Sequence, residues 1–133
     1  MGQDLIPFSI TVTDPAADAR VTVFEVPAGV GQVQVVSAIA ECSATVAEHD
    51  TNFVKLTLQD GGADGTGTAA VGAELTNLAT GSNGAWTTAT PKDFTVSEVL
   101  LDEGDRLMLK YDEGGTVAPG DIRVSGWLVR GQR

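Results

Sequence analysis

The chain has 133 residues, which suits one domain able to bury roughly two-thirds of its unfolded surface around a single core. It carries 18 acidic against 8 basic residues, and a net charge of −10 excludes nucleic acid and anionic membranes as expected partners because their phosphates would be repelled. The single cysteine excludes an internal disulfide, and no apolar run reaches the length of about 18 residues that a membrane helix needs. Because the N-terminus lacks a basic region followed by an apolar one, we expect folding in a reducing cytoplasm.

Short alternating segments, separated by Gly, Asp and Pro turns, follow one another along the chain. Apolar residues make up 42% of the sequence but aromatic residues only 5%, a composition that favours strands and turns over helices. The expected strands cover residues 8–12, 20–26, 32–42, 53–59, 71–78, 85–90 and two further segments within 100–130. The closing pair is the clearest, because Leu107, Leu109 and Tyr111 occupy every second position.

The strand at 32–42 is expected to be central in its sheet, with apolar side chains on both faces. Its two predicted rows are Val33, Val35 and Ile39 on one face and Val36, Ala38 and Ala40 on the other. Between residues 68 and 92 the periodicity is weak. We expect short irregular strands there, because a compact domain seldom carries about 25 residues without structure.

About eight short strands without a convincing helix predict an all-β chain, folded as a single-domain antiparallel β-sandwich. A jelly roll fits the long connections best. An immunoglobulin-like sandwich is the alternative, weakened by the absence of a cysteine pair. We assign residues 8–133 to the sandwich and residues 1–7 to an N-terminal arm, which either reaches a neighbour or frays.

Few residues are available for catalysis. The single histidine, His49, lies between Glu48 and Asp50, which are too close in sequence to orient it as in a Ser-His-Asp hydrolase. The chain also lacks the Gly-x-Ser-x-Gly motif and a phosphate-binding loop. Cys42 falls on the apolar side of a strand without a basic sequence neighbour, so a buried structural thiol is expected. One histidine and one cysteine cannot form a zinc site. We therefore expect no enzyme activity, no cofactor and no metal.

The glycine-rich turn Asp60-Gly-Gly-Ala-Asp64-Gly65 raises the question of calcium, because this cation prefers carboxylate and carbonyl oxygens. An EF-hand loop beginning at Asp60 needs a ligand at its third position and a glutamate at its twelfth. This chain has Gly62 and Val71 there. A connecting turn is therefore expected in place of a calcium site, and by composition it is the most flexible stretch of the chain.

Two tryptophans are notable in a chain so poor in aromatic residues. If the last strand points Ile122 into the core, strict alternation turns Trp127 and Val129 outward, toward a face covered by a partner. A bulge at Ser125-Gly126 would instead return Trp127 to the core. Trp86 either anchors a partner from a loop or caps the sandwich. The candidate interface residues are Leu5, Ile6, Trp86, Trp127 and Val129.

Three stretches carry a family likeness. They are Phe24-Glu-Val-Pro-Ala-Gly29 before a valine-rich strand, Val99-Leu-Leu-Asp-Glu-Gly-Asp-Arg-Leu-Met-Leu109 and Gly120-Asp-Ile-Arg-Val-Ser-Gly-Trp-Leu-Val129. The combination resembles the small jelly-roll capsid decoration (cement) proteins and head-fibre-type proteins of tailed bacteriophages. Similar phrases occur in other jelly rolls, including tumour-necrosis-factor-like and C1q-like trimers.

The resemblance implies a non-enzymatic virion structural protein that binds the outer surface of a phage capsid and stabilises the shell. Its partner would be the major capsid protein, and it would act as a homotrimer on the capsid surface after assembly in the host cytoplasm. The alternative is a carbohydrate- or receptor-binding β-sandwich module of a phage tail or fibre, built on Trp86. A tail-tube or head-completion role is a variant of the first reading that the sequence does not exclude.

Overall fold

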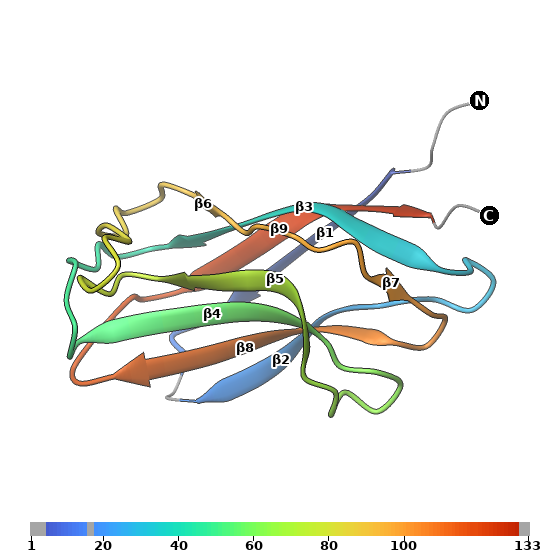
Figure 1. The fold of residues 1–133 in the computed structure, drawn as a ribbon, viewed down its shortest axis with the longest axis horizontal. Helices are drawn as coiled ribbons and strands as arrows, with labels where there is room; N and C mark the ends of the chain where they lie inside the picture. Colours follow the sequence, from blue (N-terminus) through green and yellow to red (C-terminus); the bar gives the residue numbers. More distant parts are fainter. Residues whose placement is uncertain (1–4, 16–17, 131–133) are drawn as a thin grey trace.

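The structure is a computed structural model that describes residues 5–15 and 18–130. Within these residues nine strands form two antiparallel sheets that pack face to face (Figure 1). The strands are β1 (Leu5–Val12), β2 (Ala19–Glu25), β3 (Val33–Cys42), β4 (Phe53–Asp60), β5 (Ala69–Thr76), β6 (Lys92–Asp93), β7 (Leu100–Leu101), β8 (Arg106–Gly114) and β9 (Ile122–Arg130). No helix long and apolar enough to cross a membrane occurs among the described residues.

The strands are ordered as in a jelly roll. Sheet A has the order β1-β9-β3-β6, with β7 also pairing with β3, and sheet B has the order β2-β8-β4-β5. The pairing is nested: the first strand lies beside the last, the second beside β8, the third beside β6 and β7, and the fourth beside the fifth. Because β6 and β7 both pair with β3, they act as two parts of one interrupted strand. The predicted sandwich of about eight strands is confirmed. An immunoglobulin-like sandwich would hold the first two strands in one sheet.

The core lies between the two sheets and follows the alternation of the sequence. In β8 the side chains of Leu107, Leu109 and Tyr111 point inward and are at most 2% exposed. In β9, Ile122, Val124 and Leu128 do the same. Burying such side chains is worth about 1.5–3 kcal/mol each, so the two closing strands supply a large share of the core.

Two boundaries differ from expectation. β1 begins at Leu5, because residues 5–7 already pair with Val129, Leu128 and Trp127 of β9. Part of the predicted arm thus belongs to the sandwich, and residues 1–4 lie outside the described chain. The strand predicted at 85–90 is wrong. There only Trp86 pairs, in an isolated bridge with Val46, and a bond from the Thr90 amide to the Thr87 carbonyl then turns the chain.

The two rows predicted for the central strand are also wrong, because β3 contains a bulge. Val35 pairs with Leu128 and Ser37 with Trp127, which leaves Val36 as an extra residue. The extra residue changes the phase of the alternation. Val33, Val35, Ala38 and Ala40 are buried, whereas Val36 is 42% exposed.

Candidate interface on the outer face of sheet A

The register of sheet A arranges its outward side chains in four rows across the strands. From one end of the sheet to the other, the rows are Leu5–Val129–Gln34–Leu100, Pro7–Trp127–Ser37, Ser9–Ser125–Ile39–Asp93 and Thr11–Arg123–Glu41. The bulged Val36 lies beside the second row. Residues far apart in the sequence therefore form one continuous face, which we describe from its apolar end.

All the large apolar side chains that are exposed among the described residues lie at this end. They are Leu5 (56% exposed), Trp127 (46%), Val36 (42%) and Leu100 (42%). Together with Pro7 and Val129 we call them the apolar patch. The two rows that hold the patch contain no charged side chain, although the chain as a whole has a net charge of −10. A charge-free apolar cluster on such an acidic protein is unusual for a surface that meets only water.

The patch brings together three of the five predicted interface residues. Leu5 and Trp127 are exposed, and Val129 lies between them on the same face. Val129 is only 6% exposed, so it contributes packing beneath the exposed side chains and little accessible surface. Ile6 points the other way and packs against the core. Alternation along β1 and β9 accounts for all four positions.

Trp86 does not belong to this face, and its predicted use as an exposed anchor is wrong. Its side chain is fully buried, and both its amide and its carbonyl bond to Val46 at 2.8 Å. The ammonium of Lys92 lies 5.3 Å from the ring centroid and donates to the carbonyl of Asn83 at 2.8 Å. Trp86 therefore closes one end of the sandwich, which is the second reading that the sequence left open.

Val36 and Leu100 are the residues of the apolar patch that sequence reasoning missed. Leu100 stands directly before the fully buried Leu101, and two adjacent leucines in a strand must face opposite sides. The sequence therefore contained a signal for Leu100. It contained none for Val36, because the bulge that exposes it depends on how β3 pairs with β9.

Glycine at position 126 allows Trp127 to stay outward without a bulge in its own strand. Gly126 faces inward between Phe8 and Ala38, its cross-strand partners. A Cβ atom at this position would lie 2.8 Å from Cζ of Phe8 and closer still to the carbonyl oxygen of Ser37. The Phe8 ring thus fills the space that a side chain would take, and β9 keeps strict alternation through Trp127.

Beside the patch the face is hollowed, because the third row carries two serines. The hollow has a volume of about 340 Å³. Its outward-facing lining consists of Pro7, Ser9, Ser37, Ile39, Ser125 and Trp127, with Arg123 at its far end. Arg123 forms an ion pair with Glu41 at 3.6 Å, so the far end brings little net charge. The patch and the hollow are continuous, because Trp127 and Pro7 belong to both.

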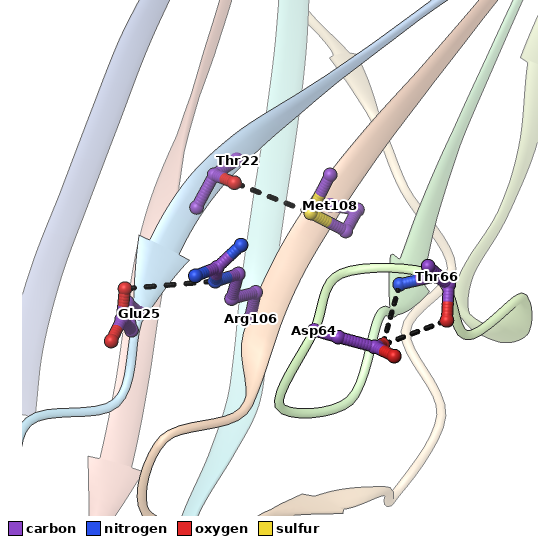
Figure 2. A network of polar contacts seen from close by, with 6 residues as sticks. All are labelled: Thr22, Glu25, Asp64, Thr66, Arg106 and Met108. Atoms are coloured by element: carbon purple, nitrogen blue, oxygen red, sulfur yellow. Dashed lines mark hydrogen bonds and ion pairs between the residues drawn. The ribbon is translucent and has the colours of Figure 1, made fainter.

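The outer face of sheet B has the opposite character. Arg20, Lys55, Arg106 and Lys110 point outward there, together with Glu25 and Asp112. Arg106 forms an ion pair with Glu25 at 3.7 Å, and the Thr22 hydroxyl donates to the sulfur of Met108 at 3.4 Å (Figure 2). The large exposed apolar side chains of the described residues therefore lie on sheet A, whereas the outer face of sheet B is mostly charged.

The turn considered for calcium folds against this charged face and is closed by an arginine. The guanidinium of Arg20 donates to the carbonyls of Gly65 at 2.7 Å and Gly67 at 2.6 Å. The Asp64 carboxylate accepts from the amide and hydroxyl of Thr66, and these bonds lower its pKa (Figure 2). Carbonyls that would serve calcium thus already bind a cationic side chain, and no group of three potential metal ligands occurs in the described chain.

The two residues weighed for catalysis have structural positions. Cys42 is buried, and burial raises the pKa of its thiol to about 12, which leaves it protonated and unreactive at neutral pH. His49 is exposed in a turn, where its Nδ1 accepts hydrogen bonds from the amides of Thr51 and Asn52 at 3.0 Å. Neither residue lies in the hollow beside Trp127.

Comparison with known proteins gives a structural match only. No protein-family model and no curated protein sequence matches the chain. A chain in the capsid asymmetric unit of cyanophage Pam1 matches with a TM-score of 0.58 and 18% identity, over 98% of this chain and 87% of that one. Infectious bursal disease virus Gx strain (TM-score 0.47, 15% identity, 96% of this chain and 31% of that chain) and desmodium yellow mottle tymovirus (0.39, 12%, 98% and 82%) match less well. This chain therefore shares its jelly-roll fold, over almost its whole length, with a chain of a phage capsid.

Proposed function

We propose that this chain is a non-enzymatic virion structural protein, a decoration protein that binds the outer surface of a phage capsid and stabilises the shell. The observation that carries the proposal is the extent of the match to the capsid chain of cyanophage Pam1, which includes nearly all of both chains. The matched chain is thus a domain of similar size, without a large additional part that this chain lacks.

The apolar patch supplies the attachment surface for this role. It presents four exposed apolar side chains on a rigid sheet, where pairing to neighbouring strands fixes their positions. Trp127 lies at its centre, and exposed aromatic side chains are the residues most enriched among energetically dominant interface contacts. In the proposed role the patch faces the major capsid protein. The protein acts as a homotrimer, and the charged face of sheet B faces solvent or the neighbouring copies in that trimer.

Binding to shells tests the function directly. Capsids of the virus that encodes this chain, prepared without it, are mixed with the purified protein and sedimented. We expect saturable binding and a higher temperature of capsid disruption with the protein bound. Light scattering of the free protein tests the trimer separately. A protein that leaves the shells entirely in the supernatant at every concentration would contradict the proposal.

A glycan-binding role on a tail or fibre is the second candidate, and the hollow beside Trp127 is the observation that favours it. Serine hydroxyls, an arginine and an exposed indole surround this hollow, and sugar rings stack on exposed aromatic faces. Because Trp86 is buried, Trp127 is the exposed tryptophan on which a sugar ring would stack. Glycan-array binding that disappears in Trp127→Ala would favour this role, and a blank array would remove it.

A further inference from the structure

We propose, resting on the function above, that the apolar patch receives a surface of the shell protein with an apolar centre and a basic rim, and not a second copy of this chain. Three properties of the outer face of sheet A support this occupant. They are the absence of charge in the apolar patch, the sign of the charge along one edge, and the small area of the patch.

The apolar patch requires an apolar partner surface. Leu5, Val36, Leu100 and Trp127 are each between 42% and 56% exposed, and no carboxylate or ammonium lies in their two rows. A charged partner group buried against these side chains would lose its hydration without gaining an ion pair, which is costly. The matching surface therefore carries apolar side chains opposite Trp127.

The edge beside β3 demands a basic partner. At this edge β6 and β7 pair with β3, and the exposed carboxylates of Asp93 and Glu98 lie in and just before these two strands. The turn after β7 adds three further carboxylates, which already accept hydrogen bonds within the chain; they are those of Asp102, Glu103 and Asp105. The same edge has one base, Lys92, whose ammonium donates to the carbonyls of Asn83 and Gly84. The opposite edge, β1, carries no charged residue at all. The face is thus neutral on one side and acidic on the other, and lysines or arginines on the partner would complement the acidic side.

A second copy of this chain cannot supply those bases without breaking contacts of its own. Each of the seven basic side chains in the described residues already has an intramolecular contact. They are Arg20, Lys55, Lys92, Arg106, Lys110, Arg123 and Arg130. The charge pattern therefore favours a different protein as the occupant.

The size of the patch favours a shell over a single soluble partner. Four half-exposed side chains present on the order of 300 Å² of apolar surface, comparable with the largest patch on a typical monomer. A stable complex of two proteins buries about 800 Å² on each partner. One patch alone would bind weakly, whereas an oligomer on a lattice of identical sites gains avidity from several such contacts.

The test uses shells of the encoding virus, prepared without this protein, as the probe and the two tryptophans as reporters. Trp127 is exposed and Trp86 is fully buried, so acrylamide quenches mainly Trp127 in the free protein. We expect shells to protect Trp127 from quenching, and we expect Leu100→Ser to weaken shell binding about tenfold. The free protein alone should remain quenchable at all concentrations, trimeric or not.

The charge requirement is tested with a matched pair of double variants. Asp93→Asn/Glu98→Gln removes two exposed carboxylates from the acidic edge, and Asp18→Asn/Glu74→Gln removes two exposed carboxylates elsewhere. We expect the first to weaken binding about threefold to tenfold at low salt, with the difference lost at about 1 M salt, and the second to bind like wild type.

The outcomes separate this inference from the proposed function. If the shells bind but Trp127 stays quenchable and Leu100→Ser binds normally, the decoration role stands and the patch assignment is overturned. If Trp127 becomes protected with rising protein concentration and no shells, the occupant is a second copy. If Asp93→Asn/Glu98→Gln binds like wild type at low salt, the claim that the partner surface has a basic rim is contradicted. Failure of wild type to bind any shell removes the proposed function itself.

Discussion

Trp127 pairs across the sheet with Ser37, not with Val36, because β3 carries one residue more than β9 at this point. The extra residue, Val36, joins Trp127 on the outer face while Val35 and Ala38 on either side remain in the core. The bulge therefore adds a side chain to the apolar patch without disturbing the inward rows.

Deletion of Val36 tests this relationship. Without it Val35 and Ser37 become neighbours that still pair with Leu128 and Trp127, so the inward and outward sets stay in phase. We expect the variant to fold, with a loss of about 1–2 kcal/mol in unfolding free energy measured by urea titration. Deletion of Ile39 is the control, since it moves Ala40 out of phase with its buried neighbours and should prevent folding.

Gly126→Ala is expected to destabilise the protein by about 1–3 kcal/mol. The new Cβ would meet the Phe8 ring and the backbone of Ser37 and Ala38. Shortening Phe8 to leucine in the same chain should recover little, because two of the three obstacles are backbone atoms. Ser125→Ala, a change of similar size on the outer side of β9, should have a free energy of unfolding within about 0.5 kcal/mol of wild type.

Asn77→Ala is expected to cost about 2–4 kcal/mol in urea unfolding, because a fully buried amide group loses three partners. Its Oδ1 accepts from the Val54 amide at 2.8 Å, and its Nδ2 donates to the carbonyls of Ala47 and Asn52 at 2.7 and 3.1 Å. The loss leaves those backbone groups unsatisfied. Asn83→Ala, which removes an exposed amide bonded to two turn carbonyls, should cost far less.

Arg20→Gln is expected to release the turn at residues 61–67 from sheet B. The variant loses the guanidinium bonds to Gly65 and Gly67, so we expect faster amide exchange of the turn and faster cleavage by proteases. Calcium should leave the melting temperature of the wild type unchanged, because the turn is already closed by a cation. A calcium-dependent rise in melting temperature would contradict this account of the turn.

Stability is expected to fall with pH above about 9. Burial raises the pKa of Cys42 from 9.0 to about 12, and burial also raises the pKa of Tyr111. Below pH 9 the Cys42 thiol is protonated in the folded and in the unfolded chain, so the effect is absent. Between about 9 and 12 the unfolded thiol ionises while the folded one does not, which favours unfolding. The urea midpoint should decline over this window, less steeply in Cys42→Ala, and a thiol reagent at pH 8 should label only unfolded protein.

Most of the strand pattern was readable from the sequence because alternation is a local property. The buried sets of β8 and β9 follow directly from the spacing of Leu107, Leu109, Tyr111, Ile122 and Val124. The segment at 85–90 misled the prediction, since one bridge at Trp86 suffices to bury the indole without a strand.

Local alternation along the chain was enough to predict the sandwich and the inward faces of the closing strands, because the pleat of a strand sends neighbouring side chains to opposite faces. It left two positions open for Trp127 and misplaced the rows of β3, and it could not show that Trp127, Val36, Leu5 and Leu100 form one patch. Their proximity depends on β1, β9, β3 and β7 lying side by side, and on a bulge set by cross-strand pairing. Register between distant strands is a property of the whole sheet, and no local pattern encodes it.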